Sequence, residues 1–241
     1  MFKSLTKAYH DLTLLKSKKQ IDNTSINVVR YDKWTNHFCK KFQENEPYTN
    51  LQMKKLLPKL EDSSFIIDVG AHVGDTGLYL AYHLQTHYPH KNIDVIMIEP
   101  DKTKFNFIQK MIKLNKLTNC FVINCGVSDN PSTGSLDINK EFPGATLVNE
   151  DDSGEIFIDS IDNLCKDCKV SMMHIDVEGM EYKCLVGAQN VLRNVKYIVI
   201  ELNDICERDK ERKFLKDNHY VQIENKEMLE EYNNELYMKK S

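Results

Sequence analysis

The sequence predicts a doubly wound α/β domain built on a mostly parallel, seven-stranded sheet. Apolar runs of strand length alternate with helix-length segments over residues 65–202, and strands that read as continuous apolar runs are typical of a parallel sheet covered on both faces. The last two strand-like segments, 219–224 and 234–240, are joined by only about ten residues, too few for a helical crossover. These two strands are therefore expected to pair antiparallel at one end of the sheet.

Length and composition agree with one such domain plus an appended segment. The chain has 241 residues, of which 41% are hydrophobic and 28% charged, as is ordinary for a globular protein. A net charge of −4 gives no general attraction to nucleic acid or to an anionic membrane. The N-terminal residues lack the uninterrupted apolar region of a secretory signal, so we expect a cytoplasmic protein with no transmembrane segment.

The segment before the sheet is expected to form an N-terminal helical extension over residues 1–60, with the sheet domain over 61–241. Residues 48–60 read as a helix that ends near its proline, and residues 26–31 as a short strand. An amphipathic helix is predicted over 4–19, because apolar side chains recur there at helical spacing among lysines: Leu5, Tyr9, Leu12 and Leu15.

The sheet domain itself reads as a regular series of strands and helices. Strands are expected at 65–69, 94–99, 120–127, 171–177 and 197–202, and helices at 75–86, 101–115 and 180–193.

The first strand of the series runs into a glycine-containing turn, in the stretch IIDVGAHVGDTG (66–77). A dinucleotide fingerprint has three glycines, the second of which lets the backbone approach a pyrophosphate. Counting from Gly70, the second and third positions hold His72 and Asp75, which would crowd and repel a diphosphate. No P-loop signature follows either. The turn keeps Gly70 and Gly74, enough for a tight bend beside a smaller ligand without phosphates. S-adenosyl-L-methionine has a zwitterionic amino-acid end, so we predict a methyl-donor site.

Two further strands end in polar residues that suit this ligand. Glu99 lies at the carboxyl end of the second strand, where a carboxylate can accept both ribose hydroxyls. NAD enzymes use the same device, and a solvated strand-end glutamate is the simpler alternative. After the third strand, Ser128 and Asp129 lie where an adenine edge would be, and Asp129 is the candidate acceptor. An Asx turn or a helix cap would explain Asp129 equally well.

The fourth strand is the most specific part of the sequence. The stretch MHIDVEGMEYKCLVGAQNVL (173–192) places Asp176 and Glu178 at the carboxyl end of a buried strand, followed by Gly179 and a helix. Two acids spaced i, i+2 share a face while the strand lasts. The reactive methyl group is expected to be presented here.

Five blocks together resemble the FkbM-type S-adenosylmethionine-dependent methyltransferases over residues 45–240: DVGAHVGDTG, IEPDKTKFNFIQKMIKLN, VSD, FPGATL and IDVEGMEYKCLVGA. A doubly wound, Rossmann-like sheet ending in a reversed strand pair is also the build of class I methyltransferases. The resemblance implies O-methylation, often of sugar hydroxyls in glycans, glycolipids or glycosylated metabolites. It also implies a cofactor site lined by Asp68, Gly70, Glu99 and Asp129. To these we add neighbours in the same turns: Ala71, His72, Gly74, Asp75, Thr76, Pro100, Ser128 and Asp176.

The chain departs from the family pattern at one position. The family usually has a lysine two residues before the strand-four aspartate, and this chain has His174. If the lysine takes part in the chemistry, His174 replaces it. If the lysine is structural, His174 is a satisfied core histidine, which is the reading we favour.

Methyl transfer to a sugar hydroxyl needs a positioned acceptor and a place for its proton. The hydroxyl is too weakly acidic to ionise at neutral pH, so it needs a base, or a metal that lowers its pKa. Asp176 is the first choice for the base or orienting group, with Glu178 and His72 behind it. Glu201 and Asn203, after the fifth strand, could join Asp176 around Mg²⁺. They could equally bind sugar hydroxyls or cap a strand, and we favour a site without a metal.

Two other functions remain open on the sequence. An RNA ribose 2′-O-methyltransferase has the same fold, but it usually brings a basic groove and catalytic lysines well separated along the chain. Here Lys183 follows Asp176 by seven positions, and the net charge is acidic. A non-catalytic scaffold is the second alternative, against which the intact turn glycines and Glu99 argue. The polar segment 139–155 is expected to cover the acceptor, on its position and the resemblance alone. The acceptor itself and the oligomeric state are not indicated.

Overall fold

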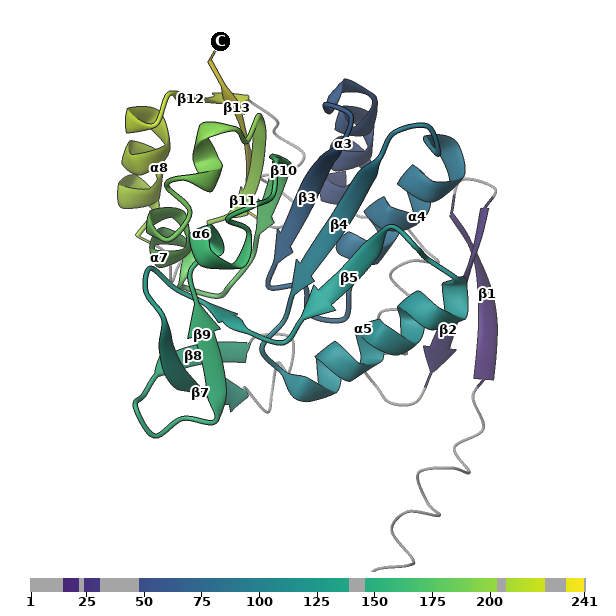
Figure 1. The fold of residues 1–241 in the computed structure, drawn as a ribbon, viewed down its shortest axis with the longest axis horizontal. Coiled ribbons are helices and arrows are strands. Elements are labelled where there is room, and N and C mark those ends of the chain that lie inside the picture. The colour runs from purple at the N-terminus through teal and green to yellow at the C-terminus, as the bar shows by residue number, and fades with distance from the viewer. Residues whose placement is uncertain are drawn as a thin grey trace, which may run out of the picture.

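The computed structural model describes residues 15–21, 24–30, 48–138, 146–202, 207–223 and 233–240. Its main feature within these ranges is a seven-stranded sheet with the order β12-β13-β11-β10-β3-β4-β5 (Figure 1). Its strands are β3 (Ser64–Val69), β4 (Ile93–Ile98), β5 (Cys120–Ile123), β10 (Val170–Ile175), β11 (Tyr197–Glu201), β12 (Tyr220–Ile223) and β13 (Asn234–Lys239).

The sheet has the predicted directions. The strands from β11 to β5 run parallel to one another, whereas β13 pairs antiparallel with both β11 and β12. Both the doubly wound sheet and its reversed terminal pair are therefore confirmed.

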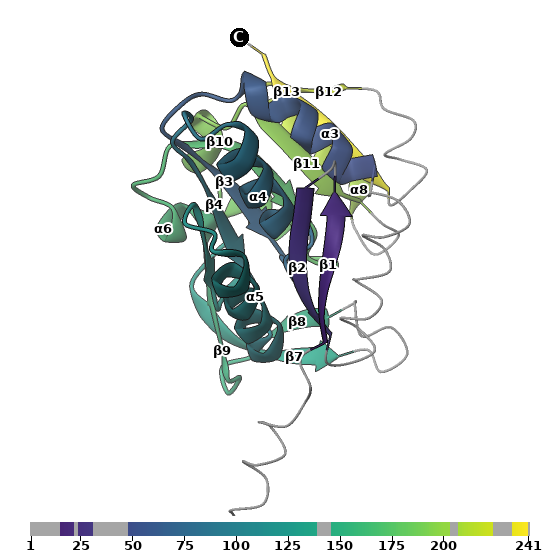
Figure 2. The same cartoon turned by 90° about the vertical axis from the view of Figure 1, so that its right-hand side faces the viewer.

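Helices cover both faces of the sheet. On one face lie α3 (Tyr48–Leu56), α4 (Gly77–His87) and α5 (Lys102–Asn115) (Figure 2), and on the other α6 (Ile161–Leu164), α7 (Glu181–Val186) and α8 (Arg208–Asp217). Neighbouring residues of a strand point to opposite faces, so Ile66 belongs to the apolar cluster under α3 and α4, and Ile67 to the cluster on the other side. The two clusters explain why the strands read as continuous apolar runs.

Two smaller sheets lie outside this core. β1 (Leu15–Ile21) and β2 (Thr24–Arg30) form an antiparallel pair, and β2 contacts α5. β6 (Gly126–Val127), β7 (Ser132–Ile138), β8 (Thr146–Glu150) and β9 (Ile156–Asp159) form a four-stranded sheet of order β6-β9-β7-β8. This second sheet occupies the connection between β5 and β10.

The helix predicted over 4–19 is wrong in its last part. Residues from Leu15 onward form β1, whose partner β2 is rich in β-branched residues that favour strands. Pairing with β2 decides the structure from Leu15 onward, because the helical spacing of apolar residues rests mainly on side chains before β1. Residues 4–14 of that prediction lie outside the described ranges.

Two long predicted elements are interrupted for identifiable reasons. The strand expected over 120–127 breaks after β5, because the Asn124 side-chain amide donates to the main-chain oxygens of Glu99 (2.9 Å) and Pro100 (2.8 Å). The chain then continues as β6 in the second sheet. The helix expected over 180–193 ends at Val186, with Gly187 beyond it and a single 3₁₀ turn at Val191–Arg193. A β-carbon on Gly187 would lie 2.3 Å from the main-chain oxygen of Ser128.

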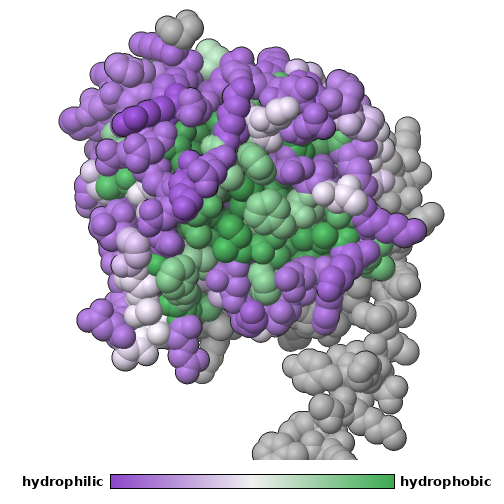
Figure 3. Space-filling model, in the orientation of Figure 1, coloured by the Kyte–Doolittle hydropathy of each residue, from purple (hydrophilic) through white to green (hydrophobic). Residues whose placement is uncertain are grey.

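Helix α6 is too short to cover its side of the sheet completely. Figure 3 shows apolar side chains gathered near the middle of the face that Figure 1 presents, over β4 and β5. Phe121 on the edge strand β5 is 45% exposed, and Phe157 on β9 is 56% exposed. Across the described ranges we find no helix with the length and apolarity needed to cross a bilayer.

Candidate functional site

The candidate site lies where the direction of chain winding changes. After β3 the chain continues to β4 on one side, and after β10 it continues to β11 on the other, while β3 and β10 are neighbours. Ligands of open α/β sheets bind beyond the carboxyl ends of strands at such a switch point. Gly70 is the first residue after β3 and Asp176 the first after β10. The Asp176 N–H donates to the oxygen of Val69 at 3.0 Å.

The turn after β3 is held by main-chain contacts. The N–H groups of Gly70 and Ala71 both donate to the oxygen of Ile98 at 3.0 Å, and the Gly74 N–H donates to the oxygen of Ala71 at 2.6 Å. Gly70 and Gly74 each have φ +81°, and His72 has φ +52°. A left-handed conformation at Gly70 and Gly74 costs little because glycine has no β-carbon. The predicted tight bend is therefore present, with His72 at its partly exposed tip.

Glu99 lies at the end of β4, beside this turn. One carboxylate oxygen accepts the His72 N–H and the other accepts the Asp101 N–H, each at 2.8 Å. The residue is 3% exposed, and burial raises its pKa to about 7, although the charge of Lys104 and both hydrogen bonds lower it. Each carboxylate oxygen has two lone pairs, so the amide contacts leave acceptor capacity on both oxygens.

Asp68 is buried below the turn. Its Oδ2 accepts the N–H of Gly77, the first residue of α4, at 2.8 Å. Its Oδ1 lies 2.8 Å from Nδ1 of His174 on the neighbouring strand β10. Asp68 therefore links the beginning of α4 to β10 and supports the turn from behind.

His174 is buried among carboxylates. Burial alone would lower its pKa, but the hydrogen bond and charge of Asp68, together with the charges of Asp176 and Asp75, raise it overall. The surrounding carboxylates therefore favour the imidazolium form of His174.

Asp176 and Glu201 form a close acidic pair at the ends of the neighbouring strands β10 and β11. The pKa of Asp176 is raised well above its ordinary value, chiefly by burial and then by the charge of Glu201, to which it is hydrogen-bonded. The charge of Glu178 acts in the same direction, and that of His174 opposes it. A second negative charge so close disfavours ionisation of both carboxyl groups at once.

Glu178 does not continue the face of β10. The strand ends at Ile175, and Glu178 has φ +52°, so the chain has already turned. Glu181, at the beginning of α7 and 1% exposed, holds this segment. Its carboxylate accepts the N–H groups of Val177 (3.2 Å) and Gly179 (2.8 Å).

Ser128 and Asp129 follow β6 at the edge where an adenine would lie. The Ser128 side chain is fully buried, and its hydroxyl contacts Asp129 Oδ1 at 3.1 Å and the carboxylate of Glu150 on β8. The second oxygen of Glu150 accepts from Lys183 Nζ on α7 at 2.5 Å. The polar segment expected over 139–155 thus contributes strand β8 and a link to this edge, while residues 139–145 lie outside the described ranges.

Among the residues that the structure describes, no group of three or more His, Cys, Asp or Glu side chains could hold a metal ion. Asn203, named above beside Glu201, lies outside them.

A family model, the methyltransferase FkbM domain, matches residues 68–233, more than two thirds of the chain. The match contains the turn, Glu99, Asp129, Asp176 and Glu201. The chain belongs to the FkbM methyltransferase family. Methyl transfer from S-adenosylmethionine is the reaction of this family, so the predictions of family and methyl donor are confirmed at that level.

Solved structures share the fold of this FkbM methyltransferase. The FkbM methyltransferase from Methylobacillus flagellatus KT superposes with a TM-score of 0.52 at 18% identity, covering 86% of this chain and 55% of its own. A proposed rRNA methylase from Clostridium thermocellum superposes with a TM-score of 0.50 at 12% identity, covering 79% of this chain and 94% of its own. The chain thus spans little more than half the length of the Methylobacillus protein, and at these identities the likeness shows the fold alone. No protein of curated function matches the sequence.

The residues at the switch point fit S-adenosylmethionine as the methyl donor of this FkbM protein. The turn 70–77 contains no lysine or arginine to neutralise a phosphate and carries Asp75, whereas Glu99 beside it keeps acceptor capacity on both carboxylate oxygens. When bound, the donor supplies an electrophilic methyl group on a sulfonium ion.

Sequence reasoning missed several residues that organise the site. Glu181 could have been found, because an acid at the first position of a helix often accepts N–H groups of the preceding loop. The others act through tertiary contacts that carry no local pattern: Asn50 on α3, whose side-chain amide contacts Asp75 and Thr76, together with Asn124 and Glu150.

Proposed function

We propose that this methyltransferase acts on a sugar hydroxyl of a glycan, glycolipid or glycosylated metabolite, with Asp176 as the base. The observation that carries the proposal is the acidic pair of Asp176 and Glu201 at the switch point. Its raised pKa makes the Asp176 carboxylate a stronger base than an exposed aspartate. A raised pKa increases the driving force for taking a proton from a hydroxyl.

In this proposal the chain's own groups position the acceptor and take its proton. Asp176 accepts the hydroxyl proton as the acceptor oxygen forms its bond to the methyl carbon and the carbon–sulfur bond breaks. Glu201, which is hydrogen-bonded to Asp176, orients the Asp176 carboxylate toward the hydroxyl. Placement of the hydroxyl in line with that bond supplies much of the rate.

The charge of the acceptor side supports a sugar rather than RNA. Asp176, Glu178 and Glu201 together make this edge acidic, and a polyphosphate chain would be repelled there. Lys183 is engaged with Glu150 at the adenine edge. A neutral polyhydroxyl acceptor meets no such repulsion and offers hydroxyls to carboxylate oxygens.

The test is methyl transfer from labelled S-adenosylmethionine to a panel of neutral glycans, glycolipids, nucleotide sugars and capped RNAs. We expect label on a sugar-containing acceptor, at an oxygen identified by mass spectrometry. Label on RNA ribose alone, or on a nitrogen or carbon atom, would contradict the proposal. The same assay with a chelator is expected to give unchanged turnover, whereas loss of turnover that Mg²⁺ restores would establish a metal.

A further inference from the structure

The turn over residues 70–77 is supported by a residue that lies outside the segment matched by the family model. Asn50, on α3, precedes that segment by 18 positions (68 − 50) and is 2% exposed. Its side-chain amide contacts two consecutive residues of the turn. Nδ2 donates to the main-chain oxygen of Asp75 at 3.2 Å, and Oδ1 accepts from the hydroxyl of Thr76 at 3.0 Å.

These contacts replace the usual capping of α4. Thr76 occupies the position before the first residue of the helix, yet its side chain makes no capping hydrogen bond. Its hydroxyl is donated to Asn50 instead, while the N–H of Gly77 is satisfied by Asp68. The end of the turn is thus held from two sides, by β3 through Asp68 and by α3 through Asn50.

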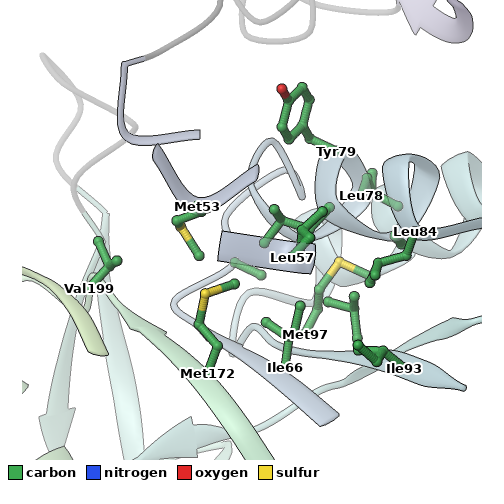
Figure 4. Packing of buried hydrophobic residues seen from close by; sticks show 14 of the residues in the cluster. Met53, Leu57, Ile66, Leu78, Tyr79, Leu84, Ile93, Met97, Met172 and Val199 are labelled. Atoms are coloured by element: carbon green, nitrogen blue, oxygen red, sulfur yellow. The ribbon is translucent and has the colours of Figure 1, made fainter. Parts of the chain in front are cut away.

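Helix α3 is a firm support for this contact. Met53 and Leu57, one and two turns after Asn50, are fully buried and belong to the apolar cluster that contains Ile66 and Met172. Figure 4 shows Met53 and Leu57 directed into that cluster. Residues 48–57 are therefore packed into the sheet domain that they precede.

We propose that Asn50 is a positioning residue for the turn over residues 70–77, so that α3 contributes to the cofactor site. The inference rests on the proposed location of the donor at residues 70–77. Without the Asn50 amide, the carbonyl of Asp75 and the buried hydroxyl of Thr76 each lose a hydrogen bond, and the turn is free to leave the geometry that meets the ligand. Loss of a hydrogen bond at a buried polar group is costly, so we expect the turn to shift.

The experiment is calorimetric titration of the full chain with S-adenosylhomocysteine, well below the unfolding temperature. Asn50→Ala is expected to weaken binding by about five- to thirty-fold, the loss associated with one or two hydrogen bonds. Asn50→Asp is expected to weaken it further, because a carboxylate would face the Asp75 carbonyl oxygen without a proton to donate. Lys55→Ala, an exposed position of the same helix, is the matched control and should bind as the wild type does.

A double-mutant cycle separates positioning from general support of the fold. Thr76→Val removes only the hydroxyl, and adding it to Asn50→Ala should cost little beyond the loss from Asn50→Ala alone. Folded Asn50→Ala and Thr76→Val proteins with wild-type affinity, even if their unfolding temperatures are lower, would overturn the inference. Wild-type protein that binds no S-adenosylhomocysteine would instead overturn the proposed function, and this inference with it.

Discussion

A β-carbon on Gly70 would lie 1.8 Å from the main-chain oxygen of Asp176. These two residues follow the adjacent strands β3 and β10, so the ends of the strands approach each other only because position 70 has no side chain. The positive φ of Gly70 adds to this requirement. The turn proposed to face the donor and the residue proposed to face the acceptor are therefore joined through one backbone contact.

Replacement of Gly70 should damage the fold as well as the site. Gly70→Ala is expected to lower the free energy of unfolding by more than about 2 kcal/mol and to abolish S-adenosylhomocysteine binding, because the backbone of Asp176 must move. Thermal unfolding and calorimetry would measure both. Gly126→Ala is a control, since its β-carbon would meet only side-chain atoms, of which the nearest belongs to Ile158 at 3.1 Å. A Gly70→Ala protein as stable as the control would mean that the contact is not tight in solution.

Cofactor affinity should depend on the ionisation of Glu99. Because the pKa of Glu99 is about 7, the carboxylate that we propose accepts the ribose hydroxyls forms as the pH rises through neutrality. Affinity for S-adenosylhomocysteine is expected to increase between pH 6 and 8 by roughly ten-fold, the scale of a charge-assisted hydrogen bond. Glu99→Gln should bind weakly and without this pH dependence. A steep pH dependence that survives in Glu99→Gln would assign it to another group.

Ionisation of Glu99, which is expected to favour cofactor binding, should lower the stability of the fold. A pKa raised from 4.5 to about 7 in the folded protein means that the folded state binds the proton more tightly. The stabilisation is fully present below pH 4.5 and is lost as the pH rises through about 7. Wild-type unfolding free energy should therefore fall more steeply across this window than that of Glu99→Gln.

The contact between His174 and Asp68 should be worth more to stability than a surface ion pair. Both side chains are buried, and removing one member leaves a buried charge without its partner. His174→Gln is expected to cost roughly 3–5 kcal/mol, measured by denaturant unfolding. His174→Lys, which restores a cation, should recover part of that loss. Equal losses in the two variants would show that shape rather than charge matters there.

The link between Glu150 and Ser128 should affect cofactor binding more than the link between Glu150 and Lys183. Ser128 is fully buried, whereas Lys183 and Glu150 are partly exposed, and exposed ion pairs contribute about 0–1 kcal/mol. Glu150→Ala is expected to weaken S-adenosylhomocysteine binding by roughly three- to ten-fold, the effect of a lost hydrogen bond to a buried hydroxyl. Lys183→Ala should change it by less. The reverse order would remove Ser128 from the adenine edge.

The sequence predicts the sheet well because its central strands β3, β4, β10 and β11 are buried apolar runs, and the turn glycines and strand-end acids mark its carboxyl edge. It predicts less where a tertiary contact decides the outcome. Asn124 ends β5 by bonding to the residues after β4, and Gly187 ends α7 against Ser128, neither of which leaves a periodic signal. The family resemblance implies that Asp68 lines the cofactor site, and in the structure its two carboxylate oxygens contact Gly77 and His174.

The turnover of Asp176→Asn tests most directly whether Asp176 takes the proton of the acceptor hydroxyl. The amide keeps the shape of the side chain and removes its ability to act as a base. With the acceptor that the labelling panel identifies, turnover is expected to fall by about 10²–10⁴, while S-adenosylhomocysteine affinity stays within a few-fold of the wild type. A folded Asp176→Asn enzyme with wild-type turnover would contradict the account.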